Sequence, residues 1–152
     1  YPVKCVEVFN RIAERIEKSG GANYQTSAEL TTPRQKLVKS AVVMANELRA
    51  AGMLVFTVHG TMAKYAAWMR PHYSPIFAVC ADEQVAESLS MHRAVYPVVV
   101  PFTHRESEPL IGIALKQLVA AGHLKTGDQI VIISSIAIGE SHADAIQMRT
   151  IE

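Results

Sequence analysis

Residues 52–71 read GMLVFTVHGTMAKYAAWMRP, and this stretch decides the fold. It begins with an apolar, β-prone run, passes through the polar turn Val58–Thr61 and continues in a helical pattern, which predicts strand, loop and helix. Gly60 tolerates close approach of the backbone and Thr61 is a good N-cap, so the first N–H groups of the helix are expected to point outward. A helix N-terminus of this kind attracts anions, phosphate above all. Most β–α connections nevertheless bind nothing, so position alone makes the turn a hypothesis.

The composition is that of one compact, well-buried domain. The chain has 152 residues, of which 49% are hydrophobic, and its mean hydropathy is +0.14. No apolar run is long enough to span a membrane, so no membrane partner is expected. The formal net charge is only +1 and the 15 lysines and arginines are dispersed, which leaves no basic footprint for a nucleic acid partner.

The two cysteines, Cys5 and Cys80, lie far apart and match no metal-ligand spacing. We interpret both as reduced thiols of an intracellular protein. The sequence opens Tyr1-Pro2 with neither an initiator Met nor a signal-like segment, which suggests a piece of a longer protein.

Strand-like runs alternate with helical stretches after residue 52. The runs are 53–57, 75–80, 95–100 and 129–134, and the helical stretches are about 61–69, 82–92 and 108–121. Such alternation indicates a mainly parallel sheet covered by helices on both faces. The segment 145–151 follows the fourth run without a helix between them, so it is expected to pair as an antiparallel edge strand. The predicted fold is α/β, a three-layer α/β/α sandwich of about five strands, mainly parallel with an antiparallel C-terminal edge strand.

Two helical patterns precede the alternating region. The first starts at Pro2 and carries a single apolar stripe without an evident partner, so it is expected to pack poorly or to dock on another molecule. The second starts at Thr32-Pro33 with Gln35 three residues after the cap, which predicts a capping box, and Gly52 is expected to end it. The predicted organisation is a helix over 1–20, a polar linker over 21–31 and a domain over 32–152.

Three side chains near the C-terminus, Ser134, His142 and Asp144, are the residue types of a hydrolytic triad. No Gly-x-Ser-x-Gly elbow surrounds the serine, so we interpret the segment as a solvated loop between two strands. The six histidines do not show the spacing of metal ligands, and no metal site is predicted. Trp68 is assigned to packing on the sheet or to a subunit contact rather than to a cofactor site.

Two loops are left as candidate ligand sites, Thr57–Thr61 and Ser134–Glu140. Both follow strands of the predicted parallel sheet, and open α/β sheets bind their ligands at the carboxyl ends of the strands. A small ligand is therefore expected at these loops.

The order of motifs resembles the C-terminal domain of pyruvate kinase, preceded by the last helix of that enzyme's catalytic barrel. The resemblance covers essentially the whole chain. It is carried by Tyr1-Pro2-x-x-x-Val6, Leu54-Val55-Phe56-Thr57 with its glycine-containing loop, an aromatic-rich helix ending Arg70-Pro71, Pro75-Ile76-Phe77-Ala78-Val79, Val95-Tyr96-Pro97-Val98, Lys125-Thr126-Gly127-Asp128 and Met148-Arg149.

The resemblance implies that the parent enzyme transfers the phosphoryl group of phosphoenolpyruvate to ADP, using magnesium and usually potassium. The catalytic groups of the family belong to the upstream barrel, and its motifs are not in this sequence, so we expect no catalytic residue and no cofactor here. Residues 1–20 are expected to belong to the barrel. The family further implies a homo-oligomer, a tetramer in which this domain forms one of the dimer contacts, and a cytoplasmic location with a plastid as the alternative.

In many members of the family this domain also binds a sugar-phosphate effector, at the loop that matches Thr57–Met62. The predicted effector-binding residues are Thr57, His59, Gly60, Thr61, Ser134 and Gly139. Members activated by fructose bisphosphate often have a loop of the type Thr-Lys-Ser-Gly-Arg-Ser, and both cations are absent from this one. Leu110 stands near the place of an expected arginine, and Glu140 would repel an anion. We therefore expect a sugar monophosphate or a nucleotide as the effector, and no tight fructose bisphosphate site.

Two alternatives belong to other functional classes. The chain could be a free-standing module that binds a phosphorylated metabolite, or a purely structural interaction domain whose loop binds nothing. The sequence upstream of Tyr1 would distinguish the first alternative, and a binding screen with sugar phosphates and nucleotides the second.

Overall fold

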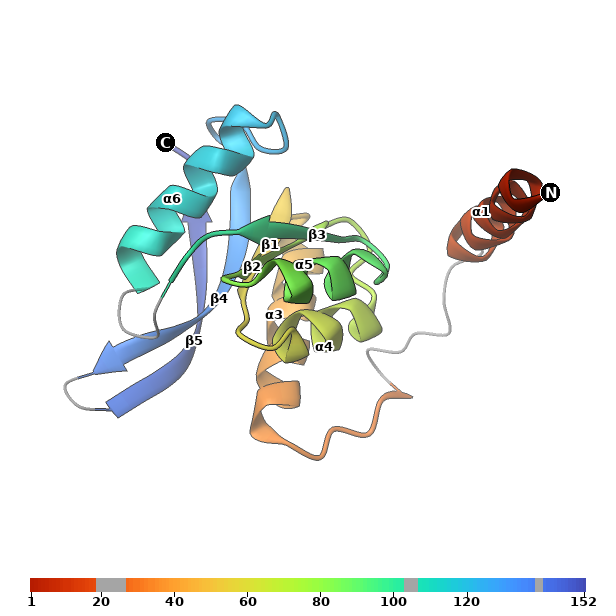
Figure 1. Ribbon diagram of the computed structural model, residues 1–152. Helices are drawn as coiled ribbons and strands as arrows, with labels where there is room; N and C mark the ends of the chain where they lie inside the picture. Colours follow the sequence, from red (N-terminus) through yellow and green to blue (C-terminus); the bar gives the residue numbers. More distant parts are fainter. Residues whose placement is uncertain (19–26, 103–106, 139–140) are drawn as a thin grey trace.

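The computed structural model describes residues 1–18, 27–102, 107–138 and 141–152 (Figure 1). Helices and strands alternate through most of the chain, as the sequence predicts. In order, the elements are α1 (Pro2–Lys18), α3 (Pro33–Leu48), β1 (Gly52–Phe56), α4 (Thr61–Met69), β2 (Ile76–Cys80), α5 (Glu83–Ser90), β3 (Val95–Val99), α6 (Ser107–Ala120), β4 (Gln129–Ile138) and β5 (Ser141–Thr150).

The strands form one five-stranded sheet in the order β3-β2-β1-β4-β5. β1 lies between β2 and β4 and is parallel to both, with Leu54 opposite Phe77 on one side and Ile132 on the other. Among the described strands, only β5 runs antiparallel, along the outer edge of β4. The predicted mainly parallel sheet with an antiparallel C-terminal edge strand is thus confirmed.

Helices cover both faces of the sheet (Figure 1). On one face, side chains such as Met53 and Val55 pack with α3, α4 and the α5 residue Leu89. On the opposite face, Leu54 and Phe77 pack with α6. Strand residues therefore alternate between two apolar clusters, and the predicted three-layer sandwich is confirmed.

The C-terminal hairpin is longer than the sequence analysis predicts. β4 continues to Ile138 and β5 begins at Ser141, so Ser135 pairs with Asp144 and Ala137 with His142. The interpretation of residues 135–138 and 142–144 as loop was therefore wrong, whereas Ser134 belongs to the strand as the run 129–134 predicts. Residues 139 and 140 lie outside the described residues. Pairing between the two strands satisfies their backbone hydrogen bonds whatever the polarity of the side chains. Local composition therefore does not predict how far such a hairpin extends.

One end of α3 confirms the prediction and the other differs from it. The capping box at Thr32 is confirmed, because its Oγ1 accepts from Gln35 N at 3.3 Å and Gln35 Oε1 accepts from Thr32 N at 3.0 Å. However, α3 ends at Leu48 with Arg49 in the left-handed region (φ 49°), whereas Gly52 already belongs to β1. A non-glycine residue therefore terminates this helix, at the expense of local backbone strain.

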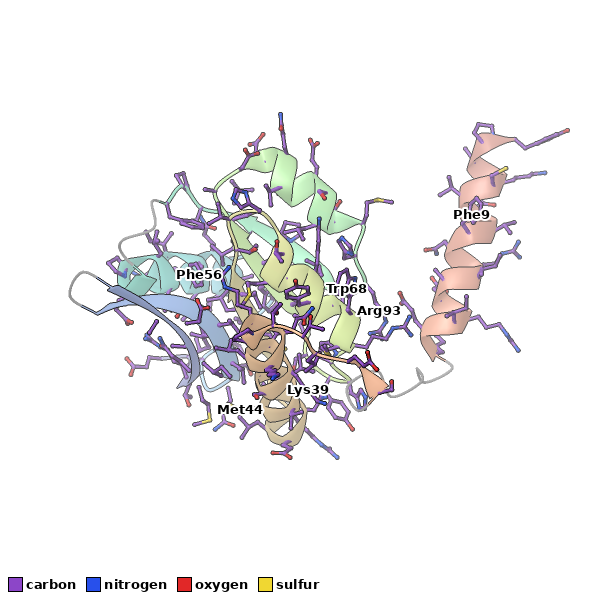
Figure 2. All side chains as sticks on the ribbon, turned by 90° about the horizontal axis from the view of Figure 1, so that it is seen from below. Phe9, Lys39, Met44, Phe56, Trp68 and Arg93 are labelled. Atoms are coloured by element: carbon purple, nitrogen blue, oxygen red, sulfur yellow. The ribbon has the colours of Figure 1, made fainter. Side chains whose placement is uncertain are left out.

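The first helix stands apart from the sheet (Figure 1). None of its residues is buried, and its apolar stripe is open, with Val6 67%, Phe9 71% and Ile12 50% exposed. An ion pair of 3.9 Å between Glu17 Oε1 and Arg93 Nε links its last turn to the α5–β3 turn. Figure 2 shows Phe9 far from the rest of the domain. The stripe is therefore not covered by the described part of the chain.

Candidate functional site

The candidate site lies where β1 ends, at the carboxyl edge of the parallel strands. Thr57 is buried and its N–H donates to the carbonyl oxygen of Val79 at 3.0 Å, which holds the start of the loop on the sheet. His59 is exposed, and Val58 is half-buried. The edge of the sheet therefore positions this loop in the way expected for ligand sites of α/β proteins.

Gly60, and not Thr61, is the N-cap of α4. Its backbone lies in the left-handed region (φ 81°), its carbonyl oxygen accepts from Lys64 N at 3.0 Å, and the cap has no side-chain hydrogen bond. A Cβ atom at this position would also lie 3.2 Å from Leu89 Cδ2. Glycine is needed here because of backbone conformation and space, and the first N–H groups of α4 are left without a side-chain acceptor from the cap.

One cation beside this loop was missed in the sequence analysis. The Lys64 side chain passes next to Gly60, since Lys64 Cε would lie 3.5 Å from a Cβ atom at that glycine. Its position four residues after the N-cap is the signal that could have revealed it, because residues i and i+4 neighbour each other along a helix. The site therefore has a positive side chain, although the loop itself has no lysine or arginine.

The structure brings Thr57, His59, Gly60 and Thr61 together at the start of α4. The fifth predicted residue, Ser134, follows Ile132 by two positions in β4 and so faces α6, on the other side of the sheet from α4. Its buried Oγ accepts from Gln147 Nε2 at 3.4 Å. Gly139, the sixth, lies outside the described residues.

Ser134, His142 and Asp144 do not form a hydrolytic triad. Asp144 is opposite Ser135 in the hairpin, so its side chain and that of Ser134 lie on opposite faces. Asp144 Oδ2 instead accepts from Arg34 Nε at 3.3 Å. Within the described ranges, no group of three or more histidine, cysteine, aspartate or glutamate side chains is placed to hold a metal ion.

A polar network ties α6 to β5 on the far face of the sheet. Arg149 donates two hydrogen bonds to the Glu108 carboxylate, at 2.6 and 2.5 Å, and two more to Gln147 Oε1. The hydrogen bonds from Arg149 lower the pKa of Glu108, and the same contact raises the pKa of Arg149. Because Arg149 can only donate, it orients the Gln147 amide so that its nitrogen faces Ser134.

Burial affects one further titratable group near the candidate site. Cys80 ends β2 and is fully buried, and burial together with the nearby Asp82 raises the pKa of its thiol. Both cysteines are free thiols, and Cys5 is exposed. In the described part of the chain, no helix is both long and apolar enough to cross a membrane.

The fold defines an α/β domain of the mainly parallel, helix-covered class, and its candidate ligand loop precedes α4, whose N-cap is Gly60. The model of the family described as pyruvate kinase, alpha/beta domain, matches residues 35–148. A relative named pyruvate kinase isozyme G, chloroplastic, from Ricinus communis is 31% identical over 144 residues, which is 89% of this chain and 32% of the relative. The pyruvate kinase of Geobacillus stearothermophilus is 29% identical over 145 residues, 93% of this chain and 24% of that protein.

The solved structures show the same fold. Cryptosporidium parvum pyruvate kinase in complex with ADP superposes with a TM-score of 0.76 over 85% of this chain and 26% of that one, at 21% sequence identity. The chain belongs to the pyruvate kinase alpha/beta domain family. It spans about a third or less of the length of the relatives that it matches.

Proposed function

We propose that this chain is the C-terminal regulatory and assembly domain of a pyruvate kinase. The match of the family model over residues 35–148 is the observation that carries the proposal. The parent enzyme would transfer phosphoryl from phosphoenolpyruvate to ADP with magnesium and potassium bound by its barrel, and this domain would contribute no catalytic group. It would work in the cytoplasm, or in a plastid, as the name of the Ricinus communis relative suggests.

A coupled assay of pyruvate formation tests the catalytic part of this proposal. The purified chain, given phosphoenolpyruvate, ADP, magnesium and potassium, should form no pyruvate above a protein-free control. Turnover that scales with the concentration of the chain would contradict the assignment.

The apolar stripe of α1 supports a barrel partner. Val6, Phe9 and Ile12 recur at helical spacing and are half or more exposed. A contiguous apolar surface of this kind marks an interface, and about two thirds of the length of the Ricinus communis relative lies outside the match and could cover it. Residues 1–20 would thus be a helix of the barrel and residues 21–31 a linker to the domain over 32–152.

The edge strand β5 supports self-assembly. It has ten residues, and among the described strands only β4 pairs with it. Charged side chains on an edge strand usually oppose pairing with another chain. In β5 two of them are neutralised within the domain, because Asp144 pairs with Arg34 and Arg149 pairs with Glu108. Met148 is 53% exposed on the α3 face. A second copy could therefore add its own β5 antiparallel about a two-fold axis, giving the dimer contact of the tetramer.

Light scattering after size exclusion tests this contact. Met148→Lys should shift the chain from dimer to monomer, because it places like charges at a two-fold contact. Met91→Lys is the matched control, because Met91 is 87% exposed at the end of α5 and away from the edge strand. If the unaltered chain is a monomer, or if both variants have the same molar mass in solution, β5 is not the interface.

The loop at β1 and α4 supports an anionic effector. A sugar monophosphate or nucleotide would receive hydrogen bonds from Thr57, His59, Thr61 and the first N–H groups of α4, starting at Gly60. Lys64 would supply the charge that the loop otherwise lacks. Ser134 would not contact this ligand directly, because it faces α6 and its hydroxyl accepts from Gln147. Gly139 is retained in the proposal as an effector-binding residue.

Thermal shift with glucose 6-phosphate and AMP tests the effector site. Saturable stabilisation should be reduced in Thr61→Ala and Lys64→Gln, and kept in Thr126→Ala, a control at an exposed loop on the other edge of the sheet. No shift with either ligand would leave the domain a structural interaction module.

A further inference from the structure

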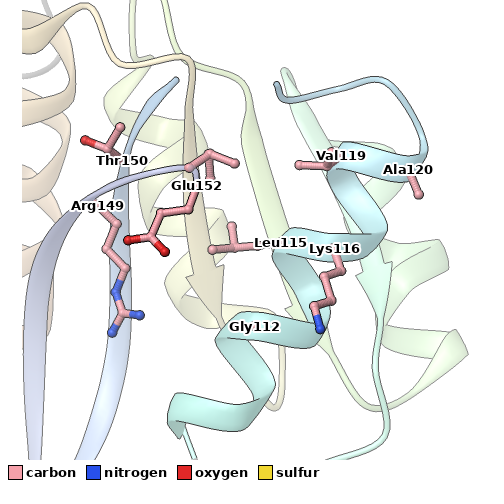
Figure 3. A pocket seen from close by; sticks show the side chains of 9 residues that line it. Gly112, Leu115, Lys116, Val119, Ala120, Arg149, Thr150 and Glu152 are labelled. Atoms are coloured by element: carbon pink, nitrogen blue, oxygen red, sulfur yellow. The ribbon is translucent and has the colours of Figure 1, made fainter. Parts of the chain in front are cut away.

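An open groove runs between α6 and the end of β5, away from the candidate effector site (Figure 3). Its volume is about 950 Å³, within the range that small organic ligands occupy. Thr150 on its wall is opposite Gln129, the first residue of β4, so the groove lies toward the amino end of that strand. The effector loop lies at the opposite, carboxyl edge of the sheet.

One face of α6 forms a wall of this groove. Gly112, Leu115, Lys116 and Val119 recur at helical spacing and all line it. A Cβ atom at Gly112 would have no other atom within 4 Å, so the backbone of α6 is open to the groove at that point. With Ile151 on the other side, the groove has an apolar lining next to accessible helix backbone.

Two cations also line the groove, Lys116 from α6 and Arg149 from β5. The side chain of Arg149 is 32% exposed, and that of Glu108, whose carboxylate accepts from both terminal nitrogens of the guanidinium, is 69% exposed. Because the Glu108 side chain is open to solvent, another anion can reach the Arg149 guanidinium and compete with this carboxylate. Glu152 lines the groove as well, and its side-chain carboxylate offsets one of the two positive charges.

We propose that this groove binds a small organic monoanion with an apolar body. The apolar body lies on Leu115, Val119 and Ile151, and the anionic group pairs with Arg149. Lys116 adds a positive charge from the α6 side of the groove (Figure 3). Glu108 is the internal competitor for the Arg149 guanidinium and leaves it when the ligand binds. The site is independent of the proposed effector loop.

Titration of the full chain with 2-naphthoate, followed by backbone amide NMR, tests the proposal. Saturable shifts are expected at residues 112–120 and 149–151. Acetate, which has the charge alone, and the neutral 2-naphthylmethanol should both bind more weakly. Shifts confined to residues 57–64 would overturn the groove and point to the effector loop, and equal binding of the neutral compound would overturn recognition of the anion.

Two substitutions should change the affinity for 2-naphthoate in opposite directions. Lys116→Gln should weaken binding of 2-naphthoate about two- to fivefold, and Glu108→Gln should tighten it by a similar factor. Lys36→Gln, on α3 and exposed, is the control for loss of a positive charge and should leave the affinity unchanged. A purely structural ion pair would make Glu108→Gln neutral or harmful to binding, and either result would overturn the role of Glu108.

A size series at Gly112 tests the place of the ligand. Gly112→Leu should fill the groove and abolish binding, whereas Gly112→Ala adds one carbon into open space and should retain it. Circular dichroism confirms that each variant is folded. Undiminished binding in a folded Gly112→Leu variant would overturn the site, and if that variant does not fold, unchanged binding in Lys116→Gln would do so.

Discussion

Gly52, the first residue of β1, lies directly against the ring of Phe77 in β2. A Cβ atom at Gly52 would be 2.5 Å from Phe77 Cε2 and 2.9 Å from Cδ2, which is closer than atoms pack in proteins. Phe77 is almost fully buried and its ring also contacts Tyr96 and His123, with centroids 6.0 and 5.7 Å away. The ring therefore has little freedom to move aside.

Gly52→Ala should lower the free energy of unfolding by about 1–3 kcal/mol, because the added methyl group overpacks the core beneath α6. Urea denaturation measures this change. Gly112→Ala is the matched control and should instead raise stability by about 0.5–1 kcal/mol, since it adds a helix former where nothing is in the way. Equal effects of the two substitutions would show that the contact with Phe77 does not matter.

Thr32→Ala should destabilise the domain by about 0.5–2 kcal/mol, because it removes the acceptor for Gln35 N at the start of α3. Thr32→Ser keeps a hydroxyl in the same place and should restore most of the loss. Thermal unfolding of the two variants measures the difference. Similar melting temperatures for both would mean that the methyl group of Thr32, and not the capping box, supports the helix.

The ion pair between Glu108 and Arg149 should make stability depend on pH on the acid side. Hydrogen bonds from Arg149 lower the pKa of Glu108 in the folded chain, so the contribution is present above the ordinary carboxyl pKa of about 4.3 and is lost as the pH falls through the lower, folded value. The difference in melting temperature between the unaltered chain and Glu108→Gln should be constant from pH 5 to 7 and shrink below about pH 4.3.

Glu87→Gln, on the exposed face of α5, is the control for that comparison. It should show no such narrowing at low pH. A difference for Glu108→Gln that stays constant down to pH 3 would mean that the ion pair does not contribute in solution.

The two cysteines should differ sharply in reactivity. Cys5 is exposed on α1, whereas Cys80 is buried and its pKa is raised, so its thiol stays protonated and out of reach at neutral pH. Iodoacetamide should therefore modify Cys5 and leave Cys80 intact until the chain is unfolded in guanidinium chloride, as mass spectrometry of peptides would show. Equal labelling of both in native buffer would mean that β2 opens readily.

Much of the fold could be predicted because its signals are local. The apolar runs that became β1 to β4 and the helical spacing between them follow from residues that are close in sequence. The capping box at Thr32 is another local signal, since its two partners are three residues apart. The hairpin was predicted too short because residues 135–138 and 141–144, at its far end, are held in strands by pairing with each other.

The position of the candidate site could be predicted from the sequence, but the list of its residues was partly wrong. Gly60 and Thr61 could be located because a strand, a turn and a helix follow one another in sequence. The Ser134 hydroxyl was grouped with them, although the alternation of side chains in β4 directs it toward α6 and Gln147. Lys64 was not predicted because it belongs to α4 and not to the loop, and only the fold of the helix brings it next to Gly60.

By itself the sequence determined the α/β class, the parallel sheet with its antiparallel edge and the family resemblance, because periodicity and short motifs depend on neighbouring residues. Only the tertiary structure decided which side chains meet across long separations. It joined Glu108 to Arg149, placed Phe77 over Gly52 and opened the groove between α6 and β5. These contacts depend on the register of the strands and on where α6 lies on the sheet, and neither is encoded in any short stretch of the chain.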